Sequence, residues 1–380
     1  MDISFRMDMK ILYFVEGIYN KGGIARIVVD KANYLAEKLG YDVTICVLYN
    51  WKQSAYNLSH KVKVCKLDNV DSNKLSLLSK LAITFKYYSR LKALLHELQP
   101  DIIVNAQTPG VTWVLPFICK KIPKIMEIHF SYIGMKHNIE DKNRLFQKMY
   151  FIFNKHFYKR YSRFVVLTEE DLPYWHLNNI AVIHNFTNLT TDHLSDLKSK
   201  RIICVARYHQ GKKLNLLIES WARICDKNKD WKVEVFGKGP DKQKLQLQID
   251  ELGLTSSFIL HDAVDDIKSE YLKSSIFALT SEYEGFALVL LEAMSMGLPI
   301  CMFNVVGTSW LSNAEQAVLA CDFGDIDKFT ENLSLLMNDF DLRKKIRDNA
   351  LKELPKYHID HIMKQWNDLF EQCIGNYEKN

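Results

Sequence analysis

The chain has 380 residues, of which 48% are apolar and 25% are charged, an ordinary globular composition that argues against a disordered chain. A chain of this length exceeds one ordinary core, so we expect two domains of roughly 180 residues each. The net charge of +5 combines a basic first half, where residues 1–185 carry 26 Lys and Arg against 16 Asp and Glu, with an acidic second half carrying 24 against 29. This asymmetry indicates two domains with different partners.

The cysteines and the apolar runs set the expected compartment. Eight cysteines are scattered singly, without a C-x-x-C pair, and no His or Cys lies at metal-ligand spacing. We therefore expect reduced thiols and no bound metal. The N-terminal stretch MDISFRMDMKILYFVEG is too charged for a signal peptide, and no apolar run reaches the roughly 18 residues of a membrane span. The expected location is the cytoplasm, with at most peripheral binding to the inner face of the cell membrane.

The first half alternates short apolar runs, which predict buried strands, with longer amphipathic segments, which predict helices. Strands are expected at 10–15, 42–48, 62–67, 101–105, 124–129, 163–167 and 180–184. A helix expected at 75–98 ends before Pro100. Another, expected at 24–39, shows near-helical spacing through Ile24, Ile27, Val28, Lys31, Leu35 and Leu39.

The alternation restarts after a polar stretch at 186–199, which we interpret as a linker between a first domain at 1–185 and a second at 200–355. Second-domain strands are expected at 201–206, 232–236, 257–261, 276–280 and 299–303, and helices at 215–225, 241–252, 284–296, 326–338 and 342–354. A last helix is expected at 360–377, within a C-terminal segment at 356–380. The pattern predicts the α/β class, with two doubly wound, Rossmann-like domains and an active site in the cleft between them.

The strongest chemical signal is the segment SEYEGFALVLLEAM at 281–294, which spans an expected strand-to-helix junction. Glu284 and Glu292 are eight positions apart, which would place them two turns apart on a similar helix face. Unpaired N–H groups of Phe286, Ala287 and Leu288 would form an anion site, and a buried Glu292 would need a partner such as a ribose diol. A capped core helix with one surface Glu is an equally weighted alternative.

A basic loop, VARYHQGKK, follows the first expected strand of the second half. Arg207 and Lys212 would project from the carboxyl edge of the sheet into the cleft. Two cations there can hold a diphosphate and offset the charge that builds on it as it departs. The alternative is a basic turn in water, which is disfavoured by the position of the loop.

Three further features are weaker. Gly22 and Gly23 allow close approach of the backbone to a ligand at a helix N-terminus, and Gly237 lies in a similar turn that could contact a nucleotide. Each could equally be a plain turn. His129 ends an expected strand, so it is either a satisfied structural residue or, given its place at a carboxyl edge, a catalyst.

The segment 144–164, RLFQKMYFIFNKHFYKRYSRF, combines six Lys or Arg with eight aromatic residues and has no acidic residue. Basic and aromatic residues on a helix suit peripheral contact with an anionic membrane. The competing interpretation, weighted equally, is that the aromatic side chains pack against the first sheet.

Together, EGFALVLLEAMSMGLPI, the upstream VARYHQGKK and the N-terminal Gly-Gly resemble the GT4 family of retaining glycosyltransferases, over nearly the whole chain. The resemblance implies the GT-B fold, in which two Rossmann-like domains face each other across a cleft. The first domain would lie on the acceptor side, the second would bind the nucleotide sugar, and the last helix would pack back towards the first. The resemblance implies no metal, because family members usually need none, and no cofactor, because the nucleotide sugar is a substrate.

The resemblance also implies roles for matching residues. Arg207 and Lys212 would bind the donor diphosphate. Glu284 would contact the transferred sugar, with His129 beside it, and Glu292 would hold the ribose hydroxyls. The remaining donor contacts would come from Gly22, Gly23, Phe286, Ala287 and Leu288.

Departures from the family pattern at Ala287, Lys213 and Asp262 affect the expected donor specificity and not the class. The expected activity is retaining transfer of a sugar from a nucleotide-diphosphate donor, UDP by family frequency, to a lipid-linked or cell-envelope glycan. The alternatives are a nucleotide-sugar epimerase and a non-catalytic sugar-nucleotide-binding protein. Nucleic acid is not an expected partner, because no recognisable binding module accompanies the basic charge.

Overall fold

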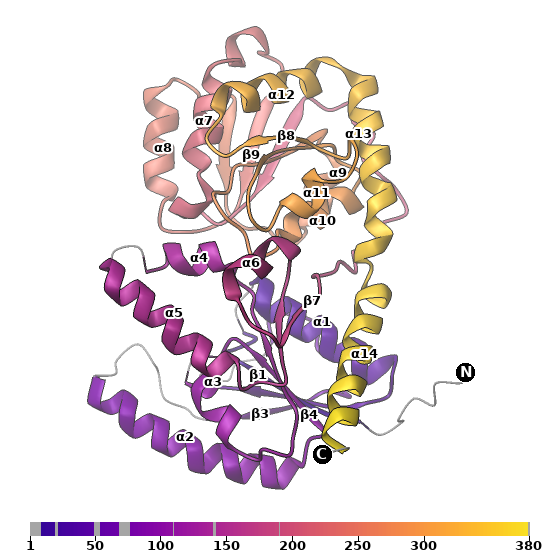
Figure 1. Cartoon of the computed structure of the whole chain (residues 1–380). Coiled ribbons are helices and arrows are strands. Elements are labelled where there is room, and N and C mark those ends of the chain that lie inside the picture. Colours follow the sequence, from indigo (N-terminus) through magenta and orange to yellow (C-terminus); the bar gives the residue numbers. More distant parts are fainter. Residues whose placement is uncertain are drawn as a thin grey trace. The chain divides into compact units, whose positions relative to one another are not determined.

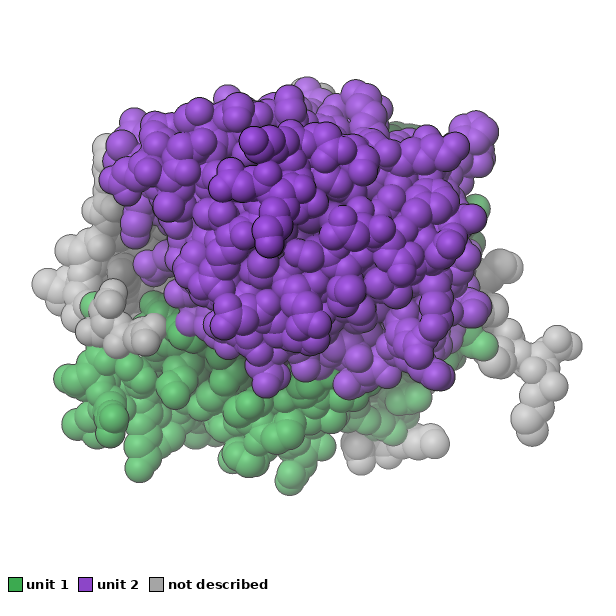
Figure 2. Space-filling view, turned by 90° about the horizontal axis from the view of Figure 1, so that it is seen from above, with its two compact units in different colours: residues 1–184, 362–380 green, residues 185–361 purple. Residues whose placement is uncertain are grey.

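The computed structural model describes residues 9–19, 22–48, 54–67, 77–108, 110–139, 142–189 and 191–378. The chain divides into two compact units, which Figure 2 shows in different colours. Unit 1 comprises residues 1–184 and 362–380, and unit 2 comprises residues 185–361. The expected start of a helix at residue 75 lies outside the described residues.

Unit 1 contains a parallel sheet whose described strands number seven, in the order β3-β2-β1-β4-β5-β6-β7 (Figure 1). The strands are β1 (Lys10–Val15), β2 (Asp42–Val47), β3 (Lys63–Lys66), β4 (Ile102–Ala106), β5 (Lys124–Glu127), β6 (Arg163–Val166) and β7 (Ile180–Val182). The helices are α1 (Gly23–Glu37), α2 (Leu77–Leu98), α3 (Val111–Val114), α4 (Tyr132–His137), α5 (Arg144–Tyr158), α6 (Leu172–Trp175) and α14 (Ile359–Glu378), which belongs to unit 1 from residue 362.

The central strands of unit 1 are near-continuous apolar runs because helices cover both faces of the sheet. Every residue of β1 after Lys10 is buried. Side chains alternate between the two faces, so Leu12 and Phe14 enter one core cluster with α2 and α5, while Tyr13 points to the other face. On that other face α1 places Lys31 over the Tyr13 ring.

The last helix, α14, packs on unit 1, as the expected fold requires (Figure 1). Its Trp366 is 1% exposed, and its Asn367 accepts a hydrogen bond of 2.7 Å from the hydroxyl of Tyr41. Near its end, the hydroxyl of Tyr377 lies 3.2 Å from that of Ser162. Polar contacts thus accompany the apolar packing along the helix.

Unit 2 contains a second parallel sheet, whose six described strands follow the order β10-β9-β8-β11-β12-β13 (Figure 1). The strands are β8 (Arg201–Val205), β9 (Lys232–Phe236), β10 (Phe258–His261), β11 (Ile276–Leu279), β12 (Ile300–Asn304) and β13 (Leu319–Asp322). The helices are α7 (Leu214–Ala222), α8 (Lys242–Glu251), α9 (Ile267–Leu272), α10 (Leu288–Ser295), α11 (Ser309–Ser312), α12 (Ile326–Asn338) and α13 (Phe340–Glu353). Two doubly wound parallel sheets confirm the predicted α/β class.

The differences from the sequence-based expectation concern short elements. The sequence does not predict β13, a four-residue strand whose only neighbour in the described sheet is β12. It also misses helices of four to six residues, such as α3 and α9, which are too short to show a period. The segment interpreted as a linker, 186–199, lies in unit 2, where Thr187 donates a backbone hydrogen bond of 3.0 Å to Tyr357.

Candidate active site

The carboxyl edge of the second sheet carries most of the predicted donor-binding residues. β8 and β11 are hydrogen-bonded neighbours, although β9 and β10 lie between them in sequence. The loops that follow such strands diverge and leave a switch point, where α/β sheets bind their ligands. Arg207 and Lys212 lie in the loop after β8, and Glu284 lies in the loop after β11.

Lys212 and Glu284 form an ion pair at this switch point. The Nζ of Lys212 lies 2.6 Å from Oε1 of Glu284, and the same oxygen accepts the hydroxyl of Ser281 at 2.6 Å. The two charged side chains keep 26% and 12% exposure, so the pair is partly desolvated and still open to a ligand. Thr280 donates to the carbonyl of Lys212 at 3.0 Å and ties the two loops together. The sequence predicts both charged residues but neither their pairing nor the contact with Ser281.

Arg207 is the second predicted cation of this edge. Its side chain is exposed and forms no hydrogen bond or ion pair with any residue that the structure describes. Lys212 is thus paired with a carboxylate, whereas the charge of Arg207 stays available to an anion such as a diphosphate.

The helix expected from residue 284 begins later than predicted. α10 starts at Leu288, with Ala287 as its N-cap. The N–H of Ala287 donates to the carbonyl of Gly307 at 3.4 Å, so it is not one of the unpaired amides that the sequence predicts. The N–H groups of Leu288 and Val289 have no acceptor among the described residues. The unpaired amides therefore lie further along the chain than predicted, and an anion site there stays a prediction.

The loop after β12 holds Glu284 outside the helix. The N–H of Glu284 donates to the carbonyl of Val306 at 3.1 Å, and Phe286 stacks on Trp310 with ring centroids 4.8 Å apart. Gly307 has φ +89°, and a Cβ built there would lie 2.4 Å from the carbonyl oxygen of Glu284. Only glycine is compatible with this contact. Periodicity gives no sign of it, because any glycine after a strand indicates a turn.

Glu292 lies within α10, whereas Glu284 precedes the helix, so the prediction that they share a helix face is wrong. Glu292 is 7% exposed, and its Oε2 accepts the hydroxyl of Tyr271 at 2.9 Å. A ribose is therefore not needed to explain its burial. Its role towards ribose hydroxyls stays a prediction.

Gly237 lies where two loops meet closely. Ala206 donates to the carbonyl of Phe236 at 3.1 Å, and Tyr208 donates to the carbonyl of Lys238 at 3.0 Å. A Cβ built at Gly237 would lie 1.9 Å from the carbonyl oxygen of Ala206. Protein packing alone thus requires glycine here, and contact with a nucleotide stays a prediction.

The remaining predicted residues lie in unit 1. Gly22 is the N-cap of α1, which begins at Gly23, and its N–H donates to the hydroxyl of Tyr56 at 2.8 Å. A Cβ built at Gly22 would meet nothing within 4 Å, so protein packing does not explain the glycine. His129 follows β5 and is 8% exposed, and burial lowers its pKa to about 4. It is therefore a neutral imidazole near pH 7.

The segment 144–164 divides between core and surface, so each interpretation holds for part of it. Phe151, Tyr158, Tyr161 and Phe164 are buried and belong to the core of unit 1. The exposed side of α5 instead carries large apolar side chains at 47 to 67% exposure: Leu145, Phe146, Met149, Ile152 and Phe153. No helix among the described residues has the length and apolarity that a bilayer crossing requires.

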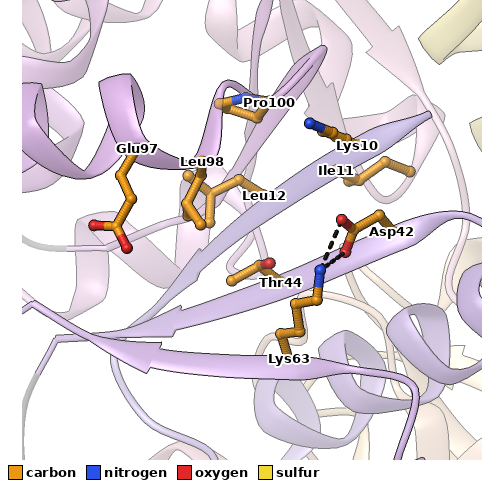
Figure 3. A pocket seen from close by; sticks show the side chains of 9 residues that line it. All are labelled: Lys10, Ile11, Leu12, Asp42, Thr44, Lys63, Glu97, Leu98 and Pro100. Carbon is orange, nitrogen blue, oxygen red and sulfur yellow. Dashed lines mark hydrogen bonds and ion pairs between the residues drawn. The ribbon is translucent and has the colours of Figure 1, made fainter. Parts of the chain in front are cut away.

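A hollow of about 200 Å³ lies at the amino edge of the first sheet (Figure 3). Lys10, Asp42 and Lys63 are the first residues of β1, β2 and β3, so the hollow lies at the amino ends of these strands. Its charges are an ion pair of 2.8 Å between Lys63 and Asp42, together with Lys10 and Glu97 (Figure 3). Ligand sites of α/β sheets lie at the carboxyl ends, so this hollow is not the candidate site.

Several relatives match the chain over nearly its whole length. A glycosyltransferase of Haemophilus influenzae is 27% identical over 368 residues, covering 95% of this chain and 99% of the relative. An alpha-1,4-N-acetyl-D-galactosaminyltransferase of Campylobacter jejuni, whose name gives a diNAcBac-PP-undecaprenol-linked saccharide, is 24% identical and covers 96% and 99%. Both relatives are glycosyltransferases by name.

The fold and the family also match. The structure of a Staphylococcus aureus TarM variant with fondaparinux, alpha-GlcNAc-glycerol and UDP superposes with a TM-score of 0.76 at 16% identity, over 95% of this chain and 99% of that one. Residues 21–191 match the family described as Glycosyltransferase Family 4, and residues 185–353 match the one described as Glycosyl transferases group 1. Both matches are to glycosyltransferase families and together they span most of the chain, which therefore belongs to the glycosyltransferases with the GT-B fold.

Proposed function

We propose that this glycosyltransferase moves a sugar from a UDP-sugar, with retention of configuration, onto a lipid-linked or cell-envelope glycan. The observation that carries the proposal is the ion pair of Lys212 and Glu284 at the switch point of the second sheet, with the exposed Arg207 in the same segment after β8 as Lys212. UDP is favoured because the structurally similar TarM variant was solved with it. The acceptor class is favoured because the Campylobacter relative is named for an undecaprenol-linked saccharide.

The proposed donor contacts follow from the charges of unit 2. Arg207 and Lys212 face the diphosphate, and the unpaired N–H groups of Leu288 and Val289 contribute the positive end of α10. Glu292 binds the ribose hydroxyls while Tyr271 holds its other oxygen. The two cations act without a bound metal, since they supply the charge that the departing diphosphate requires.

In the proposed reaction the bond between the anomeric carbon and the phosphate oxygen breaks, and its electron pair goes to that oxygen. Arg207 and Lys212 stabilise the resulting charge on the nucleoside diphosphate. The acceptor hydroxyl forms the new bond from the same face, and its proton goes to a phosphate oxygen. A double displacement through a protein nucleophile is not proposed, because Glu284 is already engaged by Lys212 and Ser281 and no second opposed carboxylate is identified in the part of the chain that the structure describes.

The first experiment screens nucleotide sugars by thermal shift and then measures transfer. A UDP-sugar should raise the Tm more than GDP- and ADP-sugars, by an amount that corresponds to about 2.7 kcal/mol at a hundred times Kd. With polyprenyl-diphosphate-linked saccharides added, UDP release should depend on the acceptor and the product should keep the donor's anomeric configuration. A converted sugar without acceptor would indicate an epimerase, and binding without turnover a non-catalytic protein.

We further propose that α5 lies on an anionic bilayer, where a lipid-linked acceptor would be presented. Its apolar side chains Met149 and Ile152 are 61% and 59% exposed, so most of their surface is not used in packing within unit 1. Exposed cations flank them, namely Arg144, Lys148, Lys159 and Arg160, and the segment has no acidic residue. Interfacial helices bind membranes by inserting apolar side chains and by the attraction of their Lys and Arg to anionic headgroups.

The double variant Met149→Glu and Ile152→Glu should bind phosphatidylglycerol-containing vesicles at least about tenfold more weakly. Two inserted apolar side chains are lost, and two negative charges now face the anionic headgroups. The measurement is co-sedimentation with vesicles of defined composition. Leu247→Glu is the matched control, since Leu247 of α8 is also 61% exposed but lies in unit 2. Equal loss in the control, or undiminished binding of the double variant, would contradict the assignment.

A further inference from the structure

A group of buried polar side chains meets beneath the carboxyl edge of the first sheet, next to His129. Lys31 of α1 and Glu127, the last residue of β5, are 0% and 1% exposed. The Nζ of Lys31 lies 2.5 Å from Oε1 of Glu127, and the same oxygen lies 3.6 Å from Nε2 of His129. Ionised side chains are seldom buried this deeply unless they are paired, so their retention in the core calls for an explanation.

Two aromatic rings lie close to the ammonium of Lys31. The ammonium lies 3.8 Å from the ring centroid of Trp366 in α14 and 5.8 Å from that of Tyr13 in β1. Burial lowers the pKa of Lys31, while Glu127 opposes that shift. Three buried atoms here have no hydrogen-bond partner among the described residues: Oε2 of Glu127, Nε2 of His129 and the hydroxyl of Tyr13. Oε1 of Glu127, which Lys31 engages, is the oxygen that faces His129, while Oε2 has no partner among the described residues.

His129 is bonded through its backbone, and its ring faces a carboxylate. Its backbone N–H donates to Oε1 of Gln107 at 3.1 Å, and its ring presents the buried Nε2 to Glu127. A neutral imidazole carries one N–H, and a nearby carboxylate favours the proton on the nitrogen that faces it. With the proton on Nε2, the other nitrogen, Nδ1, is a hydrogen-bond acceptor.

We propose that Glu127, held in place by Lys31, is a positioning residue for His129: it fixes the neutral tautomer with the proton on Nε2, so that Nδ1 accepts a hydrogen bond from a hydroxyl of the bound sugar. This inference rests on the proposed function for the identity of the ligand. The tautomer itself is a property of the unliganded protein, so it is tested independently of transfer.

The first test is NMR of the ¹⁵N-histidine-labelled full chain, with the His129→Gln spectrum identifying the signals of His129. The proposal expects the Nε2–H tautomer in the wild type and a loss of that preference in Glu127→Gln. Glu127 raises the pKa of His129 and Lys31 lowers it, so Glu127→Gln should lower this pKa below about 4 and Lys31→Met should raise it. Tyr13, the remaining titratable group beside Glu127, stays neutral in this range because its pKa is raised well above its ordinary value.

Shifts of opposite sign distinguish a specific electrostatic effect from a general disturbance of the fold. An Nδ1–H tautomer in the wild type, or pKa shifts of equal sign in the two variants, would overturn the proposal. Either result would leave the sugar-transfer proposal standing. Conversely, absence of transfer in the wild type would remove that proposal while the NMR result still decides the tautomer.

The second test separates positioning from stability. Glu127→Gln should lower kcat by about 10- to 100-fold with a smaller change in the donor KM, comparable to the loss of the carboxylate that orients a metal-bound imidazole. The double variant Lys31→Met and Glu127→Gln replaces the ion pair with two neutral side chains of similar size. It should regain the Tm that the single variants lose, yet keep the low kcat. Recovery of kcat together with Tm would show a purely structural role and overturn the proposal.

Discussion

Replacing Lys212 with methionine is expected to lower kcat for sugar transfer by about 10²- to 10³-fold, the usual effect of removing one preorganised group from a developing charge. The ammonium of Lys212 lies 2.6 Å from Glu284 at the switch point of the second sheet. Its loss removes one of two cations available to the departing diphosphate. It also leaves the carboxylate of Glu284 with Ser281 as its identified neutral partner, so the negative charge there would oppose donor binding. Steady-state kinetics should show a lower kcat and a higher donor KM.

The matched control is Lys213→Met. Lys213 is the next residue, is similarly exposed at 30%, and pairs with Glu282 at 2.9 Å. Because its ammonium is directed to another carboxylate, the variant should stay within about threefold of wild-type kcat, consistent with the small value of partly exposed ion pairs. Arg207→Ala should resemble Lys212→Met, since Arg207 is the second cation of the edge. Wild-type kinetics in both Lys212→Met and Arg207→Ala would exclude this edge as the donor site.

The order of elements could be predicted from the sequence because apolar runs and helical periods are local signals. The start of α10 could not, since it is decided by residues far along the chain. Glu284 lies outside the helix because its backbone meets Val306 and Gly307, in a loop that follows another strand. The ion pair of Lys212 and Glu284, 72 positions apart in sequence, is a consequence of the same strand order.

Lys31 illustrates a signal that the sequence itself contains. It stands in the apolar face of the helix expected at 24–39, where a charged residue is out of place. Such a misfit predicts a buried partner but not its identity. Glu127, 96 positions away, becomes that partner only because α1 packs on the face of the sheet next to the end of β5. A lone His129 likewise looks unremarkable until the carboxylate beside it is known.

The buried pair also predicts a large effect on stability. Lys31→Met should lower the free energy of unfolding by about 3–5 kcal/mol, because it leaves the carboxylate of Glu127 buried without its cation. Glu127→Gln should lower the free energy of unfolding by a comparable amount, because the ammonium of Lys31 would then face only the ring of Trp366 and a neutral amide. The double variant should approach wild-type stability, since replacing a buried ion pair by neutral groups of similar volume is often neutral. Urea unfolding followed by circular dichroism measures all three.

The contrast with a surface pair shows why burial decides the outcome. Lys63 and Asp42 form an ion pair of 2.8 Å with side chains 64% and 38% exposed (Figure 3). Water solvates whichever partner remains, so Lys63→Met should change stability by no more than about 1 kcal/mol. If Lys31→Met changed stability as little as Lys63→Met, the Lys31–Glu127 pair would not be charged in the folded protein. The electrostatic argument for how His129 is held would then lose its basis.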